Sequence, residues 1–323
     1  MTAAAPPIST KALLADTTTV RLRPRYEGSN ICTWIGFKHV NYLVEEAVLD
    51  HFCQSGLPAR ALYEEYGLGL DIVSLDTRIL HAFHMDDLAE AEVVPFTKDG
   101  DATLGFKVTI RIERGGQTLK AVTSTVRASL RIDTYLEAAG AVPADVAPYA
   151  VERLGAYLAA EAPPAIEGED ILARLTAGEN AYGWKWTIPY PYCHFTERLQ
   201  MSGYLRLMEE AKDRFVADRG ISIKTLLDDR KWIPVVPRSD LRILDEALME
   251  EDLYLVYTVE EVFKEFTYTS RLDAYVPRDG KLVKTATGRI VHGYAVIENR
   301  RDWRLVPFDR RVLDALAGKP SGT

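Results

Sequence analysis

Two segments of the chain place a histidine upstream of a pair of glutamates, and both could carry acid–base chemistry. In the first, His39 precedes Glu45 and Glu46; in the second, His194 precedes Glu209 and a neighbouring acid at 210. A carboxylate can act as a general base or a nucleophile, and a histidine or asparagine can orient water or polarise a carbonyl. Successive helical residues point about 100° apart, so only one acid of each pair is expected to face a site.

These segments belong to an internal repeat. The sequence Glu-Glu-Ala at 45–47 and the sequence Arg-Ile-Leu at 78–80 both recur 164 positions later, at 209–211 and 242–244. A run ending in two acids at 63–65 falls opposite a similar run at 227–229. Several motifs in one order at one separation indicate a duplicated domain, since this period is too long for a solenoid unit. The same separation places His194 opposite Asn30.

Each copy predicts the same order of elements. A short strand near 20–22 or 184–188 precedes an apolar-periodic helix near 39–55 or 202–218, and Gly56 and Gly220 mark the helix ends. Strand patterns follow, with turn signals at 98–101, 114–117 and 278–281. We therefore expect a flexible arm at 1–19, a first domain at 20–135, a linker with a helix near 148–160 at 136–183, a second domain at 184–300 and a tail at 301–323.

One strand, one long central helix and an antiparallel meander are the order of the hotdog fold. The sequence thus predicts an α+β double hotdog, two tandem units that each wrap an antiparallel sheet around a central helix. A single hotdog exposes a sheet edge and pairs through it, and a tandem copy supplies that partner within one chain.

The first copy resembles the 4-hydroxybenzoyl-CoA thioesterase-like families. The matching residues are Arg25-Tyr26-Glu27 followed by a His-x-Asn-Tyr-Leu run that begins at His39. The aspartate that these families carry before the loop has no carboxylate match here. Asn30 is the nearest candidate, and the loop from it to His39 is about two residues longer than the usual pattern.

The second copy resembles the β-hydroxyacyl-acyl carrier protein dehydratases. Their motif is matched by His194-Phe195, Arg198, Met201 and Gly203, followed by Leu205 and Glu209. Ser202 replaces the proline of that motif, and the acid is displaced by one residue.

These resemblances imply sites between the copies, with the thioester carbonyl at the N-terminus of a central helix. Gly36, Phe37 and Gly203 lie near the two helix starts, and Asn41 and Tyr42 are further substrate contacts, although Tyr42 also fits a core position. One site would pair His194 with Glu45 or Glu46. The mirrored site would pair Asn30 and His39 with Glu209 or Glu210.

The functions implied fall in three classes. The first is a thioesterase that hydrolyses an acyl-CoA or acyl carrier protein thioester, in fatty-acid or polyketide metabolism. The second is a dehydratase or hydratase, or a related polyketide-tailoring lyase, acting on a β-hydroxyacyl thioester. The third is a non-catalytic hotdog that binds an acyl carrier or another ligand.

Composition excludes several other classes. The net charge of −8 disfavours nucleic-acid and anionic-membrane partners, and no apolar run is long enough to span a membrane. The three cysteines fit reduced thiols in a cytoplasm. His81 and His84 would face opposite sides of a strand, so neither a metal nor another cofactor is expected. We expect a monomer or a homodimer of double hotdogs.

Overall fold

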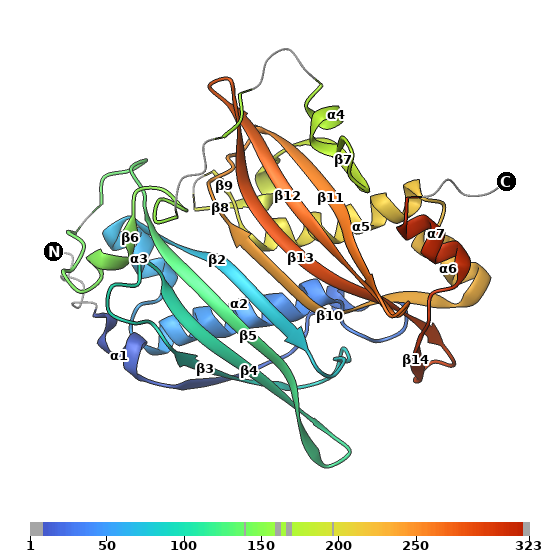
Figure 1. Cartoon of the computed structure of the whole chain (residues 1–323). Helices are drawn as coiled ribbons and strands as arrows, with labels where there is room; N and C mark the ends of the chain where they lie inside the picture. Colours follow the sequence, from blue (N-terminus) through green and yellow to red (C-terminus); the bar gives the residue numbers. More distant parts are fainter. Residues whose placement is uncertain (1–8, 139, 159–162, 166–169, 196, 319–323) are drawn as a thin grey trace.

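One large sheet, almost entirely antiparallel, runs through both halves of the chain (Figure 1). The computed structural model describes residues 9–138, 140–158, 163–165, 170–195 and 197–318. Along the sheet the strands follow the order β1-β3-β4-β5-β2-β10-β13-β12-β11-β7, with β14 added to β13 and β6 to β5. The two halves thus have the same strand order when each is followed outwards from the junction between β2 and β10.

The first half consists of a strand, a central helix and a meander. Its elements are α1 (Thr10–Ala15), β1 (Thr18–Leu22), the 3-10 turn η1 (Tyr26–Gly28), α2 (Phe37–Gln54), α3 (Ala59–Tyr66), β2 (Leu68–Ile79), β3 (Ala89–Pro95), β4 (Leu104–Arg114) and β5 (Gln117–Ile132). The linker holds η2 (Ala147–Tyr149), β6 (Ala150–Val151) and α4 (Ile171–Thr176).

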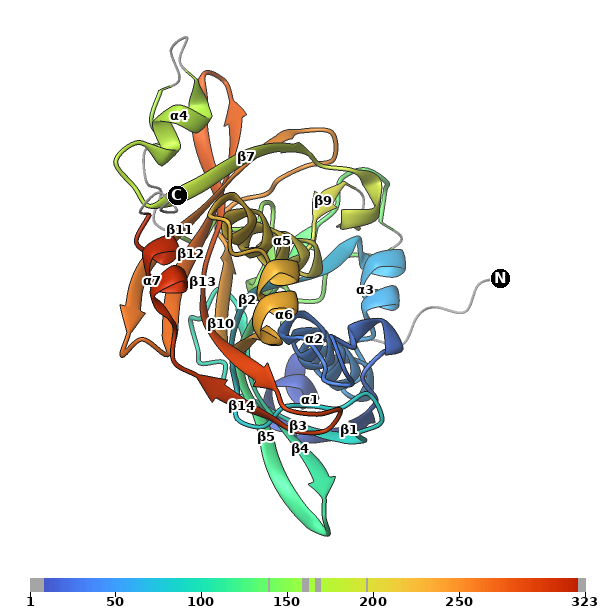
Figure 2. The same ribbon diagram turned by 90° about the vertical axis from the view of Figure 1, so that its right-hand side faces the viewer.

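The second half repeats this order. Its elements are β7 (Ala181–Thr187), η3 (Tyr190–Tyr192), β8 (Cys193–His194), β9 (Arg198–Leu199), α5 (Met201–Asp218), α6 (Ile223–Arg230), β10 (Trp232–Ile243), β11 (Asp252–Phe263), β12 (Thr267–Arg278), β13 (Lys281–Ile297), β14 (Trp303–Val306) and α7 (Arg310–Leu316). Figure 2 shows α2, α3, α5 and α6 on the same side of the curved sheet.

Local sequence explains these elements. In α2 the residues Val40, Val44, Ala47 and Val48 are fully buried, which is the spacing of a helix face laid against a sheet. The β4–β5 hairpin turns at Gly115 and Gly116, both with positive φ, as a two-residue hairpin loop requires. The expected turns at 114–117 and 278–281 are confirmed.

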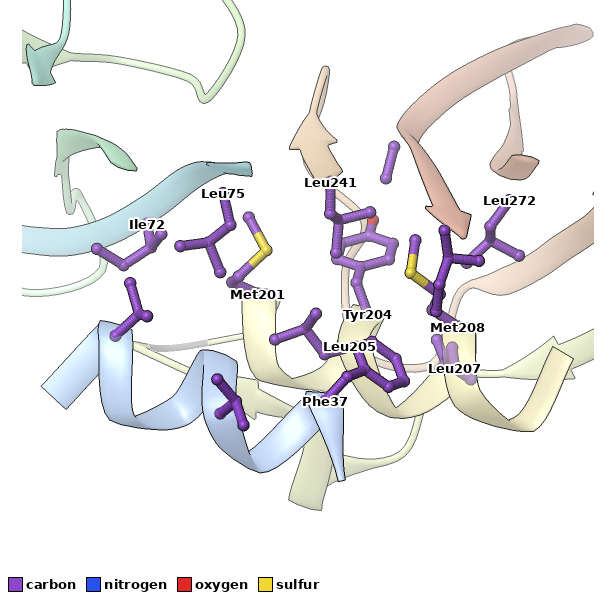
Figure 3. Close-up of a cluster of buried hydrophobic side chains, with 14 of the residues drawn as sticks. Phe37, Ile72, Leu75, Met201, Tyr204, Leu205, Leu207, Met208, Leu241 and Leu272 are labelled. Carbon is purple, nitrogen blue, oxygen red and sulfur yellow. The ribbon is translucent and has the colours of Figure 1, made fainter. Parts of the chain in front are cut away.

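The junction of the halves is packed as a hydrophobic core. Leu75 of β2 is the register partner of Leu241 of β10, and both are buried above the two central helices (Figure 3). Phe37 of α2 and Leu205 of α5 extend into the same cluster. Burying side chains of this size stabilises the fold by about 1.5–3 kcal/mol each, so the two halves form one folded body.

Three expectations about the connecting segments were wrong. Residues 9–19 are not a loose arm, because Ser9 caps α1 and Leu13 is fully buried; residues 1–8 lie outside the described part. The tail from 301 contributes β14 and α7. No α-helix forms over the described residues of 148–160, where η2 ends, β6 pairs with β5 and Gly155 passes against the backbone of Leu244. A proline at 148 and the positive φ of Gly155 both disfavour a helix there.

Candidate active site

A cavity of about 520 Å³ lies where the N-terminus of α2 faces the middle of α5. Asn30, Gly36 and Phe37 of the first half line it together with Glu209 and Lys212 of the second half. Most of the remaining wall is apolar and comes mainly from β2, β10, β14 and the loops beside them: Ile31, Trp34, Ile35, Ile79, Leu80, Ile233, Val235, Val236, Trp303 and Leu305. Asp213, Thr267 and His292 are further polar residues of the wall. The cavity is therefore built by both copies, which is the arrangement expected for a site between hotdog units.

The start of α2 offers hydrogen-bond donors to this cavity. Gly36 is the N-cap residue, and no side chain caps the helix. The backbone N–H groups of His39 and Val40 donate to the Gly36 carbonyl at 3.0 and 3.2 Å. The first turn of a helix has N–H groups without intrahelical acceptors, and the helix dipole makes this end positive. The N–H groups of Phe37 and Lys38 are thus suited to bind a developing oxyanion.

Glycine at position 36 brings Asn30 close to this helix start. A Cβ atom placed on Gly36 would lie 3.1 Å from the Asn30 Oδ1 atom, tighter than ordinary packing allows. The Asn30 amide therefore lies directly against the N-cap. An amide group there can donate to a carbonyl oxygen or orient a water molecule.

Glu209 is the carboxylate of the cavity that pairs with the start of α2; Asp213 of α5 also lines the cavity. Its Oε2 atom lies 2.8 Å from the Lys38 Nζ atom, so an ion pair joins α5 of one half to the first turn of α2 in the other. The Lys38 side chain is largely buried, and charge pairs are screened less there than on an open surface. Glu210 pairs instead with Arg214 on the same helix and does not line the cavity.

His39 does not line this cavity, in contrast to the expectation that it joins Asn30 and Glu209. The ring is buried beneath Gly28, where a Cβ atom would come within 2.6 Å of it, and its Nε2 atom is 3.8 Å from Glu27 Oε1. Burial, reinforced by Lys38, lowers the pKa of His39. The neutral ring supports the loop that carries Asn30.

The other predicted substrate contacts of α2 and α5 lie elsewhere. Asn41 is fully buried: its amide nitrogen donates to the Phe37 carbonyl at 3.0 Å and its Oδ1 accepts from Thr77 at 2.7 Å. The Tyr42 hydroxyl donates to the Ser202 carbonyl at 3.1 Å, and burial raises the pKa of Tyr42 to about 12. Gly203 is buried against Leu199 and the Tyr192 carbonyl. Tyr42 thus joins the two central helices, Asn41 joins α2 to β2, and Gly203 lets α5 pack closely against the segment before it.

His194 meets a carboxylate, but not one from α2. Its Nε2 atom lies 3.2 Å from Asp71 Oδ1, and the buried Arg198 binds the other oxygen of Asp71 at 2.8 Å. Although burial opposes ionisation, hydrogen bonds and charges from His194 and Arg198 lower the pKa of Asp71. Asp71 was not predicted as a site residue, although it interrupts an otherwise apolar strand run at 68–73 and such a buried carboxylate indicates a specific partner.

Glu45 and Glu46 are therefore not the partners of His194. Glu46 is exposed, whereas burial, with repulsion from Glu46, raises the pKa of Glu45 to about 8. Glu45 is the repeat equivalent of Glu209, but Ser202 stands where Lys38 stands in the other copy. Burial without a nearby cation therefore favours the protonated form of Glu45 near neutral pH, whereas the Lys38 ion pair favours the charged form of Glu209.

A second cavity of about 380 Å³ adjoins the first and shares Trp34, Leu80, Ala82 and Trp303 with it. His81, His84, Arg114 and Arg301 line it. The expected strand at 81–84 is wrong, since β2 ends at Ile79 and both histidines face this one cavity.

No cluster of three metal-ligating side chains occurs among the described residues. No helix in that part of the chain is long and apolar enough to cross a membrane.

Three polar residues of the site were not predicted from the sequence. Lys212 and His292 line the main cavity, and Lys38 pairs with Glu209, which lines it. The two lysines are cations within otherwise apolar helix faces, and His292 lies in an apolar strand run. Each is a polar residue at a position expected to be buried, which is the signal that could have identified it.

Solved structures with this arrangement are known. A protein of Lactobacillus plantarum, provisionally described as an oleoyl thioesterase, is 14% identical over 92% of this chain and 99% of its own, at a TM-score of 0.56. A 12:0-acyl carrier protein thioesterase of Umbellularia californica is 12% identical over 90% and 98%, at 0.55. An acyl carrier protein thioesterase of Bacteroides thetaiotaomicron is 9% identical over 85% and 97%, at 0.51.

The sequence itself has no such match. No protein-family model matches it, and no curated protein does so. Structural likeness at this identity establishes the fold, so the prediction of an α+β double hotdog is confirmed: the chain is a tandem hotdog, two units that share one continuous sheet.

Proposed function

We propose that the chain is a thioesterase that hydrolyses acyl thioesters in the cavity between α2 and α5. The observation that carries this proposal is the convergence of Glu209 and the uncapped start of α2 on one cavity. The three structural neighbours described above are thioesterases by name, which supports the same chemistry.

The residues of the cavity account for each step of hydrolysis. The thioester carbonyl oxygen accepts hydrogen bonds from the first N–H groups of α2 and from the Asn30 amide. Glu209 accepts a proton from a water molecule as that water attacks the carbonyl carbon. As the carbon–sulfur bond breaks, the thiolate leaves and takes the proton that Glu209 has accepted, which yields a free acid and a free thiol and restores the Glu209 carboxylate. Lys38 holds the Glu209 carboxylate beside the helix start through its ion pair.

The adjoining cavity fits the carrier part of the substrate. Coenzyme A and acyl carrier protein thioesters both bear phosphate on the pantetheine arm. Arg301 and Arg114 place guanidinium groups in this cavity, although Arg114 pairs with Asp87 and Asp302 also lines it. Trp34 and Trp303 give the cavity a flat apolar wall. Arginine is well suited to phosphate because its planar guanidinium donates several hydrogen bonds.

Mass spectrometry of thioesters incubated with the protein tests the proposal. A panel of acyl and β-hydroxyacyl thioesters of coenzyme A and of an acyl carrier protein should yield free acids. Formation of an enoyl thioester from the β-hydroxyacyl members would instead support a dehydratase. Unchanged substrates across the panel would favour a binding protein.

A further inference from the structure

The cavity beside Glu209 contains a second polar group of side chains that hydrolysis does not use. Lys212 lies three residues after Glu209 on α5, about 4.5 Å further along the helix axis. His292 of β13 lines the same cavity. Both side chains are buried, with 3% of the surface of Lys212 and 1% of that of His292 exposed.

His292 has no hydrogen-bond partner within the part of the chain that the structure describes. Both ring nitrogens, Nδ1 and Nε2, are buried and unpartnered. The ring stacks on Tyr268 with centroids 5.1 Å apart, which fixes its plane. A buried imidazole without partners costs free energy, so such a group calls for an occupant that satisfies it.

The Lys212 side chain lines the same cavity as His292. Its Nζ atom has three donors, and Asp213 accepts from one at 2.7 Å. The lysine charge is close enough to reinforce burial in lowering the pKa of His292 well below its usual range. The imidazole is therefore neutral, with one donor and one acceptor nitrogen.

The charges of the cavity indicate which occupant fits. Lys212 forms an ion pair with Asp213, and Glu209 forms an ion pair with Lys38. No cation remains in excess, so an added carboxylate would not be neutralised. A neutral oxygen would instead gain hydrogen bonds from a lysine and an imidazole in an otherwise apolar wall.

We propose that the cavity selects acyl thioesters whose chain carries a neutral oxygen, a hydroxyl or keto group, a few carbons beyond the thioester carbonyl, and that Lys212 and His292 bind this oxygen. This inference rests on the proposed hydrolysis at Glu209. It names the class of acyl group that the site prefers, an oxygenated rather than a plain hydrocarbon chain.

Hydrolysis of matched pantetheine thioesters tests the selection. The probes are octanoyl pantetheine, its hydroxy and keto derivatives oxygenated at successive carbons, and the octanedioic half-thioester. We expect one neutral oxygenated probe to exceed octanoyl in kcat/KM by about 10-fold or more, because a site that binds an oxygen discriminates against the analogue that lacks it. Lys212→Met and His292→Phe should each reduce that ratio towards one while octanoyl hydrolysis persists.

His51→Phe is the matched control, because His51 is also buried but binds Thr18 and Leu13 through its two ring nitrogens. It should lower the melting temperature and leave the substrate ratio unchanged. His292→Phe should keep or raise the melting temperature, since it removes an unsatisfied group. A marked fall for His292→Phe would indicate a purely structural ring and contradict the proposal.

A binding measurement shows whether a negative result contradicts the proposed selection of oxygenated chains or the proposed hydrolysis. Calorimetry of the same probes with the Glu209→Gln variant gives the ratio of dissociation constants without turnover. If no probe is hydrolysed, the thioesterase proposal fails, and the binding ratio still decides the selection. Equal affinity for plain and oxygenated chains, or the highest affinity for the carboxylate probe, would overturn the inference.

Discussion

Asp76 of β2 and Asp240 of β10 are register partners across the junction of the two halves, and they lie 164 positions apart. Each therefore faces its own repeat equivalent, so the pseudo-two-fold axis of the molecule passes between them. Arg238 binds Asp76 at 3.0 Å and offsets the repulsion at this point. The axis generates two sites, and the differences between the copies decide what each can do.

The repeat equivalents Asn30 and His194 distinguish the two sites. Asn30→Ala should lower kcat on the order of 100-fold, because it removes a donor beside the helix start that binds the oxyanion. His194→Ala should retain most thioester hydrolysis, because His194 binds Asp71 and does not line the cavity. Steady-state kinetics of both variants on one thioester measures the ranking. The reverse ranking would move the working site to His194.

Asn41 should contribute to stability and not to turnover. Asn41→Ala removes the buried hydrogen bond that Asn41 accepts from Thr77 and leaves Ser124 as the remaining side-chain partner of that hydroxyl. Losing a buried hydrogen-bond partner costs about 1–3 kcal/mol. Urea unfolding should show that loss, while kcat/KM at a temperature where the variant is folded stays unchanged. Thr77→Val acts on the same hydrogen bond and is the control. A large loss of activity in folded Asn41→Ala would instead support the substrate contact expected from sequence.

Glu45 should make stability fall as the pH rises. Its pKa is raised from near 4.5 to about 8 in the folded state. Between these values the unfolded chain releases this proton and the folded chain keeps it, so stability present at low pH is lost on the way to pH 8. One pKa unit corresponds to about 1.4 kcal/mol, which sets an upper limit of several kcal/mol for this group.

Urea unfolding of the wild type and of Glu45→Gln at both ends of this pH range measures the effect. The free energy of unfolding of the wild type should fall with pH by an amount that the variant lacks. The same pH dependence in both proteins would show that Glu45 has an ordinary pKa.

Much of the fold followed from the sequence because the repeat was visible in it. The separation of 164 positions, the helical periodicity of α2 and α5 and the glycine turns are local patterns, and they predicted the tandem architecture. The linker helix was placed wrongly near 148–160, because the alanine content there favours a helix, whereas Gly155 must pass against Leu244, a contact that only the folded chain creates; the α-helix of the linker is α4.

The site was predictable in part. The repeat and the helix starts placed Asn30, Gly36, Phe37 and Glu209 together, as the structure does. The partner of His194 could not be deduced, because Asp71 is brought to it by packing between the two halves. Neighbours in tertiary structure have no fixed spacing in sequence. The apolar run around His292 marks it as a buried polar residue, but only the folded chain shows which cavity it lines.

The most direct test of the account compares the equivalent variants Glu209→Gln and Glu45→Gln. Both replace a carboxylate on a central helix with its isosteric amide, and only Glu209 lines the cavity with the start of α2. Free acid released from a thioester is measured for each folded variant. We predict that Glu209→Gln loses at least about 100-fold in kcat, as expected when a general base is removed, and that Glu45→Gln stays near the wild type. Near-native turnover in Glu209→Gln, or a loss confined to Glu45→Gln, would contradict the assignment of hydrolysis to this cavity.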